Sequence, residues 1–331
     1  MRVGVLGLGR VAMAHLEAVQ NLSDTVTLQA VCDVDEQRAR SAAEKFQARK
    51  VYTDFTSFFR DPDLEAVIVC LPNHLHCDAV VQAAEAGKHV LVEKPMAMNL
   101  SEARKMVDAA ERKGVTLMVG QSRRFSHAIQ EARKARDQVG DLFRLDISFL
   151  VKFPAPPTPW WTDKKKAGHL IILLQGSHSI DTVVWLFDKL PRKVFSVSKR
   201  INPAFGGEDE SDILLEFDSG LASIHLSLNA EPYLHEMVWF GDKGSLRLYE
   251  YPTRKVYGFS FKLEVNGKKV LEEEQIPSLY TNQLSEFLQA IEEKRPPLAS
   301  GKEILRTMRV LDAVLESDAK GEPVILPPEE E

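Results

Sequence analysis

The sequence predicts an α/β protein, with an N-terminal doubly wound parallel sheet followed by an α+β domain built on a largely antiparallel, open sheet. Apolar runs alternate with helical patterns over the first 120 residues, a glycine-rich turn follows the first run, and strand patterns succeed one another after residue 190. The chain has 331 residues, and a domain typically has about 150. We therefore expect two domains, at residues 1–120 and 121–331.

In the first domain, short apolar strands are expected at residues 3–6, 27–32, 51–52, 66–70, 89–92 and 117–120. Helices are expected at residues 11–21, 36–46, 55–59, 75–86 and 101–113. Gly87 and Gly114 stand where a helix favours a C-terminal glycine. The run Ala66-Val67-Ile68-Val69 is continuously apolar, as in parallel strands covered on both faces. Right-handed β-α-β units are therefore expected.

The second domain has a different pattern. A helix is expected at residues 128–138, a strand at 142–151, a loop rich in proline and tryptophan at 154–161, and an apolar helix at 170–186. Strands follow at 193–199, 213–218, 221–228, 236–241 and 245–249, and helices at 281–293 and 302–317. Successive strands of this kind are typical of an antiparallel sheet.

Composition excludes several classes of protein. The 42 basic and 48 acidic residues give a net charge of −6, which argues against a nucleic-acid platform. No apolar stretch approaches the roughly 18 residues of a membrane span, so an integral membrane protein is excluded. Three cysteines are too few for a disulfide framework, and the N-terminus lacks a signal-peptide pattern. We expect a cytoplasmic protein.

A dinucleotide-binding fingerprint follows the first strand. Gly7-Leu8-Gly9-Arg10-Val11-Ala12 reads G-x-G-x-x-A, in the strand–turn–helix context of a Rossmann-type fold. Gly7 permits the tight turn, Gly9 lets the backbone approach a pyrophosphate, and Ala12 lets the helix lie close to the sheet. The N–H groups at the start of the helix, at Arg10 and Val11, meet the phosphate charge.

Asp33 ends the second strand, 24 positions beyond Gly9. Its carboxylate can accept hydrogen bonds from the adenosine ribose hydroxyls and would repel a 2′-phosphate, so NAD is favoured over NADP. Asp35 adds negative charge, whereas Arg38 is a counterweight one turn further on. The alternative role for Asp33 is a helix N-cap, which Asp35 could equally provide.

Two further motifs follow strands at the expected ligand-binding edge: Leu71-Pro72-Asn73-His74-Leu75-His76 and Glu93-Lys94-Pro95. On these motifs the sequence resembles the glucose–fructose oxidoreductase, inositol dehydrogenase and MocA family. The resemblance extends through Gly241-Asp242-Lys243-Gly244-Ser245-Leu246 and the C-terminal helices. It implies that Leu71, Pro72, Asn73, His76 and Glu93 bind the cofactor. It also implies that Lys94 reaches both the nicotinamide ribose and the substrate hydroxyl.

Lys94 is the principal catalytic candidate. Hydride leaving a carbinol carbon requires that its hydroxyl lose a proton, and a fixed ammonium stabilises the developing alkoxide. Without the resemblance, a lysine after a strand is more often a solvated loop charge; Pro95 favours a rigid turn here.

Gln121-Ser122-Arg123-Arg124-Phe125 resembles the arginine-arginine-aromatic segment of the family. Arg123 is the candidate contact to the substrate or to the nicotinamide side of the cofactor, and Arg124 is expected to pair with a carboxylate. His74, His76 and Cys77 could suggest metal ligands, but no second ligand group stands at zinc-like spacing, so no metal is expected.

Gly176-Ser177-His178-Ser179-Ile180-Asp181 resembles the family's G-x-H-x-x-D helix motif, whose histidine is the general base. An imidazole suits that task because its ordinary pKa is about 6.5. Family members commonly carry Asp or Asn four residues earlier, where this chain has Leu174. Asp181 or His169 could replace the lost polarity. Trp161 could stack on a sugar, although a lid or interface role is equally open.

Together these residues predict an NAD-dependent oxidoreductase that transfers hydride between the cofactor and a secondary alcohol of a sugar, polyol or sugar derivative. Lys94 would polarise the hydroxyl, and His178 would act as acid or base. Because of Leu174, a catalytically inactive NAD(H)-binding sensor or regulator is the alternative. Another possibility is a tightly held cofactor that cycles during aldose oxidation, elimination or epimerisation. The resemblance also implies a homodimer or homotetramer formed through the open sheet, and neither nucleic acid nor a membrane is expected as a partner.

Overall fold

The computed structural model describes residues 1–253, 259–274 and 278–329. Contacts divide the chain into two compact units, each made from two segments. The first unit comprises Met1–Phe125 and Pro277–Leu305, and the second comprises Ser126–Ile276 and Arg306–Glu331. The first unit therefore includes a C-terminal segment that a single boundary after residue 120 assigns to the second domain.

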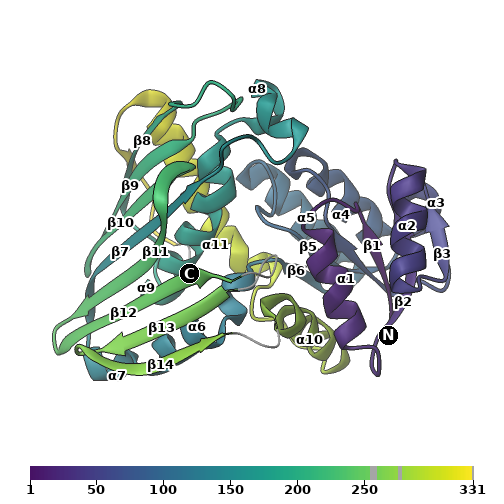
Figure 1. Ribbon diagram of the computed structural model, residues 1–331, viewed down its shortest axis with the longest axis horizontal. Coiled ribbons are helices and arrows are strands. Elements are labelled where there is room, and N and C mark those ends of the chain that lie inside the picture. The colour runs from purple at the N-terminus through teal and green to yellow at the C-terminus, as the bar shows by residue number, and fades with distance from the viewer. Residues whose placement is uncertain (254–258, 275–277, 330–331) are drawn as a thin grey trace. The chain divides into compact units, whose positions relative to one another are not determined.

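The first unit contains the predicted doubly wound sheet (Figure 1). Its six strands run parallel in the order β3-β2-β1-β4-β5-β6, and the order reverses direction beside β1. The strands are β1 (Arg2–Leu6), β2 (Thr27–Cys32), β3 (Lys50–Tyr52), β4 (Ala66–Val69), β5 (His89–Val92) and β6 (Leu117–Val119). A ligand of such a sheet binds beyond the carboxyl ends of the strands, at the point of reversal.

Several helices of this unit begin at a side chain that caps them. The five that alternate with the strands are α1 (Ala12–Asn21), α2 (Glu36–Phe46), α3 (Phe55–Phe59), α4 (His76–Glu85) and α5 (Leu100–Lys113). Asp35, Asp54 and Asn99 accept backbone N–H bonds at the starts of α2, α3 and α5. Gly114, at a positive φ of 65°, ends α5 as predicted.

The C-terminal segment completes the first unit. Helix α10 (Leu279–Glu292) packs against α1. Beyond α10, Ser300 forms an antiparallel bridge with Met118, and the Val119 N–H donates to the Ala299 carbonyl at 2.9 Å. The edge strand β6 is thereby covered by chain that lies far away in sequence.

The second unit contains a nine-stranded sheet in the order β14-β13-β12-β11-β7-β10-β9-β8-β15. Only β7 and β10 pair in parallel, so the prediction of a largely antiparallel sheet is confirmed. Its strands are β7 (Leu142–Lys152), β8 (Lys193–Lys199), β9 (Glu210–Phe217), β10 (Gly220–Ser227), β11 (Asn229–Gly241), β12 (Gly244–Pro252), β13 (Phe259–Val265), β14 (Lys268–Glu274) and β15 (Val324–Ile325). The last three were not predicted: β14 is mostly charged, β15 has two residues, and the alternating apolar pattern of β13 was overlooked.

Helices cover one face of this sheet (Figure 1). They include α6 (His127–Lys134), α7 (Arg136–Val139), α9 (Ser177–Phe187) and α11 (Gly301–Lys320), which begins in the first unit. The predicted helix at 128–138 is broken into α6 and α7 at Ala135. The predicted helix at 170–186 is π-helical at η4 (Ile172–Gly176) before it becomes α9.

One sequence-based exclusion needs correction. The helical run Lys164–Phe187 is long and apolar enough to span a membrane, contrary to the expectation that no stretch approaches that length. However, 89% of its most apolar window is buried inside the protein, so the run is explained by core packing. Gly176 shows how closely it packs, because a Cβ there would lie 3.3 Å from Cδ1 of Leu226 on β10.

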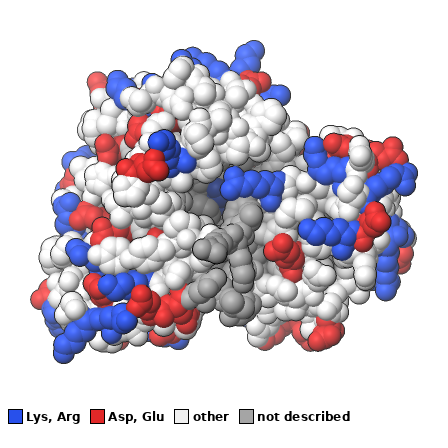
Figure 2. All heavy atoms as spheres, in the orientation of Figure 1, with Lys and Arg blue, Asp and Glu red and all other residues white. Residues whose placement is uncertain are grey.

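Basic and acidic side chains intermingle over the face of the molecule shown in Figure 2. The three cysteines, Cys32, Cys70 and Cys77, are all free and buried.

Candidate active site

The glycine-rich turn has the form that a pyrophosphate site requires. Gly7 has φ +82°, and a Cβ there would lie 2.7 Å from the Cys70 carbonyl oxygen, so only glycine fits. A Cβ on Gly9 would meet no described heavy atom within 4 Å, and Arg10 beside it is exposed. Helix α1 begins at the fully buried Ala12, with neither a capping side chain nor an acidic residue in its first turn. Its N-terminus is suited to a phosphate.

Asp33 lies at the end of β2 and anchors this turn. Its carboxylate accepts the Leu8 N–H at 2.8 Å and the Asp35 N–H at 2.9 Å. Arg38 Nη1 lies 3.2 Å from both carboxylate oxygens. Asp35, not Asp33, caps α2, so the N-cap alternative for Asp33 is excluded. The position and charge of Asp33 fit the ribose hydroxyls of an NAD-type cofactor.

The loop after β4 contributes Leu71 and Pro72, which are partly exposed, and Asn73, which is buried. His76 is fully buried, and its two ring nitrogens lie 2.9 Å from the carbonyl oxygens of Pro95 and Leu71. Burial lowers the pKa of His76, against the opposing effect of these carbonyls. His76 thus connects the loop after β4 to the loop after β5.

Lys94 follows β5 directly, at the ligand-binding edge of the sheet. Its side chain is partly buried. Burial lowers the pKa of Lys94 to about 8; the Glu93 carboxylate opposes this shift, and the Arg123 guanidinium adds to it. An amine of this pKa can hold or release a proton near neutral pH, as acid–base chemistry requires.

Glu93 is buried beside Lys94, and its carboxylate is held from two sides. His15 Nε2 lies 2.8 Å from Oε1, and the Lys94 N–H donates to Oε2 at 3.2 Å. Burial by itself raises the pKa of Glu93, but the hydrogen bond and charge of His15, together with Lys94, outweigh it and hold that pKa below its usual value. Glu93 is therefore ionised at neutral pH.

The two arginines of η2 (Ser122–Phe125) differ in role. Arg123 is buried and close enough to Lys94 to influence its charge. Arg124 donates to the Leu298 carbonyl at 3.0 Å and lies 3.5 Å from Glu303. The expectation that Arg124 pairs with a carboxylate is confirmed.

In the second unit, His178 lies in the first turn of α9 and is partly exposed. The π-helical η4 precedes it, and π-turns are frequent at functional sites. The four-residue interval from Leu174 to His178 is one turn only in a regular α-helix, and the π-helical η4 departs from that period. Asp181 is fully buried and accepts a hydrogen bond from Thr307 Oγ1 at 2.8 Å. Asp181 therefore joins α9 to α11.

Two other predicted substrate contacts have partners within the second unit. Trp161 is buried in an aromatic cluster, with ring centroids 5.4 Å from Phe153, 5.9 Å from Trp160 and 6.2 Å from Phe205. Nδ1 of His169 lies 3.4 Å from Asp318 and 3.8 Å from Glu208.

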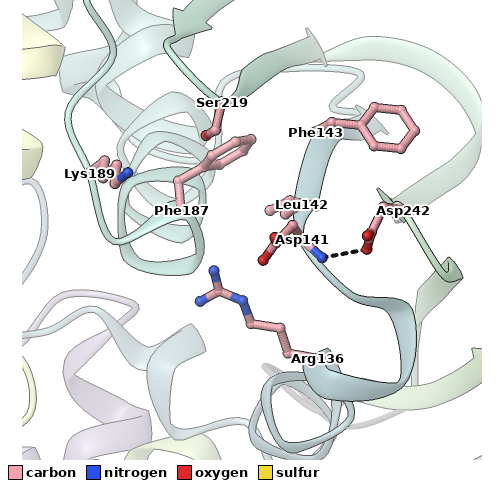
Figure 3. Close-up of a pocket in the computed structure, with 8 residues that line it drawn as sticks. All are labelled: Arg136, Asp141, Leu142, Phe143, Phe187, Lys189, Ser219 and Asp242. Carbon is pink, nitrogen blue, oxygen red and sulfur yellow. Dashed lines mark hydrogen bonds between the residues drawn. The ribbon is translucent and has the colours of Figure 1, made fainter.

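A hollow of about 480 Å³ in the second unit involves different residues (Figure 3). It is lined by Arg136, Asp141, Leu142, Phe143, Phe187, Lys189, Ser219 and Asp242. None of these is a predicted site residue, so the hollow does not mark the predicted chemistry. Across the described ranges, no group of three His, Cys, Asp or Glu side chains is placed to hold a metal ion.

Sequence reasoning missed His15 and Gly120. His15 touches Glu93 across 78 positions of sequence, and a Cβ on Gly120 would lie 3.1 Å from Glu93 Oε1. The available signal was a histidine on the buried face of α1, one turn beyond the glycine-rich turn.

The fold and these residues define a nicotinamide-dinucleotide-binding oxidoreductase. Family models match both parts of the chain: "Oxidoreductase family, NAD-binding Rossmann fold" over residues 1–121 and "GFO/IDH/MocA C-terminal domain" over residues 129–247. The chain therefore belongs to the GFO/IDH/MocA family of oxidoreductases, and NAD is its cofactor.

The chain is similar to several curated and solved proteins along nearly its whole length. It is 27% identical to myo-inositol 2-dehydrogenase of Thermotoga maritima, with 92% of each chain covered. It is 28% identical to D-apiose dehydrogenase of Paraburkholderia graminis, covering 97% of this chain and 88% of that one. The solved levoglucosan dehydrogenase in complex with NADH shares its fold at 22% identity and a TM-score of 0.86, covering 99% of this chain and 100% of the other.

Proposed function

We propose that this enzyme oxidises a secondary alcohol of a sugar, polyol or sugar derivative with NAD, or catalyses the reverse reduction. The observation that carries the proposal is Lys94, a partly buried lysine at the ligand-binding edge of the first sheet with a pKa of about 8. The names of the relatives, which include inositol and apiose dehydrogenases, support this substrate class.

We assign the cofactor to the first unit. Gly7, Gly9 and the N–H groups of Arg10, Val11 and Ala12 would hold the pyrophosphate, and Asp33 would hold the adenosine ribose. Leu71, Pro72 and Asn73 would border the nicotinamide half, and Glu93 would bind its ribose, while His76 supports their loops. When bound, NAD supplies the acceptor or donor of a hydride.

We assign the transfer of the substrate hydroxyl proton to residues of the chain. In the oxidation direction the substrate hydroxyl gives up its proton, and we assign its acceptance to His178, directly or through water. The Lys94 ammonium stabilises the negative charge that develops on the oxygen. We assign Arg123 to the substrate because its charge lies near Lys94. We assign Asp181, Trp161 and His169 to the support of the substrate-binding region, since each has partners within the second unit.

We further propose that the protein works in the cytoplasm as a homodimer or homotetramer. Its three cysteines are free, as a reducing compartment allows. The face of the nine-stranded sheet opposite the helices exposes Phe195, Val197, Leu214 and Leu221, by 37%, 46%, 43% and 39%. We take these exposed apolar side chains on one face of the sheet as the association site.

The test is Lys94→Ala, assayed by NADH formation with a panel of polyols, sugars and sugar acids. Turnover should fall by about 100-fold or more, because an acid–base and electrostatic contribution is lost. NADH affinity should change little. Lys105→Ala, which removes an exposed lysine of α5, is the matched control and should leave turnover unchanged.

Near-normal turnover in Lys94→Ala would remove Lys94 from the mechanism. If the unaltered protein binds NADH but turns over no member of the panel, a sensor role would replace the proposed activity.

A further inference from the structure

We propose that His15 is a positioning residue for catalysis, which through its hydrogen bond to Glu93 keeps that carboxylate aligned beside Lys94. This inference rests on the proposed function, in which Lys94 contacts the substrate hydroxyl. It adds to that function a residue that lies outside the edge of the sheet. Three elements meet here. His15 comes from α1, Glu93 and Lys94 from the end of β5, and Tyr280 from α10.

The hydrogen bond between His15 and Glu93 is short and buried from solvent. Nε2 and Oε1 are 2.8 Å apart, and the side chains are 0% and 7% exposed. The second carboxylate oxygen accepts the Lys94 N–H at 3.2 Å. Because each oxygen has its own donor, the plane of the carboxylate is fixed relative to the start of the Lys94 side chain.

The surroundings of His15 define its protonation. Nδ1 is buried and has no hydrogen-bond partner in the part of the chain that the structure describes. Nε2 faces the Glu93 carboxylate, which can only accept a hydrogen bond, so we assign a proton to Nε2, where it is donated to Glu93. Glu93 then keeps its full negative charge for Lys94.

Packing leaves this pair little freedom. The Tyr280 ring meets the His15 ring edge-on, with centroids 4.9 Å apart and an interplanar angle of 76°. Gly120 lies against the carboxylate, where a Cβ would be 3.1 Å from Oε1. Movement of His15 is therefore blocked by α10, and movement of Glu93 by the residue that follows β6.

Removal of the His15 donor should lower the pKa of Lys94, because it weakens the effect of the Glu93 charge on the Lys94 amine. Burial already favours the neutral form of Glu93, and the His15 hydrogen bond is the foremost effect that opposes it. Without the donor on Oε1 the carboxylate is no longer held in place beside Lys94, and a displaced carboxylate raises the pKa of Lys94 less, whereas burial and Arg123 still lower it. The other titratable groups around this pair are His76, which contacts the Pro95 carbonyl, and Cys70, whose thiol feels the Glu93 charge.

The experiment measures the Lys94 amine directly, without substrate. The intact protein is trace-labelled with acetic anhydride across a pH series, and the labelled Lys94 peptide is quantified by mass spectrometry. His15→Leu should lower the midpoint of Lys94 labelling by about one pH unit, as should Glu93→Gln. His15→Gln, whose amide can donate from nearly the same place as Nε2, should keep the midpoint near that of the unaltered protein.

The double variant His15→Leu/Glu93→Gln tests whether the effect passes through Glu93. Its midpoint should lie no lower than that of Glu93→Gln alone, because coupled residues are not additive. His89→Leu is the control: His89 lies at the other end of β5, where Nδ1 accepts the Thr116 N–H at 3.0 Å, and its loss should leave Lys94 unchanged. Thermal unfolding checks that each variant is folded, and His15→Asn, too short to reach Glu93, replaces His15→Leu if that variant does not fold.

Kinetics add a second readout. Turnover in His15→Leu should fall by about 10-fold, the KM for NAD should rise because Glu93 is also assigned to the nicotinamide ribose, and the alkaline limb of the pH profile should move with the labelling midpoint. An unchanged midpoint in the folded His15 variant, or an equal further shift in the Glu93→Gln background, would overturn the proposal. A shifted midpoint in a protein that turns over no polyol would support the positioning role while counting against the proposed function.

Discussion

In the proposed function, Asp33 and Arg38 together define the adenosine end of the cofactor site. Asp33 receives two backbone N–H groups and the Arg38 guanidinium, while Arg38 also pairs with Asp35 at 3.1 Å. The carboxylate favours ribose hydroxyls, and the guanidinium would favour a phosphate if the carboxylate were absent. We therefore propose that the Asp33 carboxylate decides between NAD and NADP, which differ in a single phosphate.

We predict that Asp33→Ser lowers NAD affinity by about 10-fold and raises NADP affinity by at least as much, because one repulsion is removed and Arg38 is released. Titration of each cofactor by protein fluorescence measures both changes. Adding Arg38→Ala should abolish the gain for NADP. Arg40→Ala is the control, since Arg40 pairs with Glu36 on the exposed side of α2. An unchanged preference in Asp33→Ser would show that other residues select the cofactor.

At the residue scale, the sequence identified residues whose roles are local. The turn at Gly7, the carboxylate after β2 and the lysine after β5 could be predicted because each follows a recognisable strand. Contacts across long stretches of sequence could not. Asp181 bonds to Thr307 over 126 positions, and His15 bonds to Glu93 over 78. Nothing in local patterning specifies such partners.

At the element scale, the turn between β1 and α1 separates two uses of glycine. Gly7 is required by the fold itself, since its φ is positive and backbone atoms of Cys70 lie against it. Gly9 has open space around it in the protein alone, and we propose that the bound cofactor is what requires a glycine there. Glycine is therefore required for different reasons at positions 7 and 9 of this motif.

We predict that Gly7→Ala lowers the free energy of unfolding by about 2 kcal/mol, from backbone strain and the close Cys70 carbonyl. Gly9→Ala should leave the unfolding temperature unchanged yet weaken NAD binding by about 10-fold or more, because its methyl group meets the pyrophosphate. Thermal unfolding without cofactor and NADH titration distinguish the two. If Gly9→Ala destabilised the protein as much as Gly7→Ala, this division of roles would be wrong.

Prediction of the elements succeeded where apolar periodicity was strong. The bounds of β2, β5, β8, α2 and α3 agree with expectation to the residue. Strand β14 was missed because five of its seven residues are charged, whereas β13 was overlooked although Phe259, Phe261, Leu263 and Val265 alternate with polar residues as in a half-buried strand. The π-turn η4 was missed because a change of helical period leaves no compositional trace.

At the scale of the whole molecule, the open sheet of the second unit has apolar side chains on its exposed face, and these require an explanation. Leu214 on β9 pairs with Phe195 on β8 and with Ser223 on β10, so these side chains share the exposed face. A broad sheet with apolar residues on its solvent side is a liability in a monomer. Association of copies through this face would remove it from water.

We predict that Leu214→Glu converts the oligomer to monomers, because a buried unpaired carboxylate in the interface is costly. Size-exclusion chromatography with light scattering measures the mass. Val51→Glu, which alters an exposed residue on β3 in the first unit, should leave the mass unchanged. A strictly monomeric unaltered protein, or a Leu214→Glu oligomer of undiminished mass, would exclude this face as the interface.

The return of α10 and of the bridge at Ser300 to the first unit also bears on how the protein is made. Synthesis proceeds from the N-terminus, so the six-stranded sheet leaves the ribosome long before the helix that packs on α1. Until residue 305 has emerged, the buried face of α1 and the edge at β6 lack their cover. The nucleotide-binding half of this enzyme can complete its packing only after the residues up to 305 have emerged, and a nascent chain halted earlier would present that uncovered surface to chaperones.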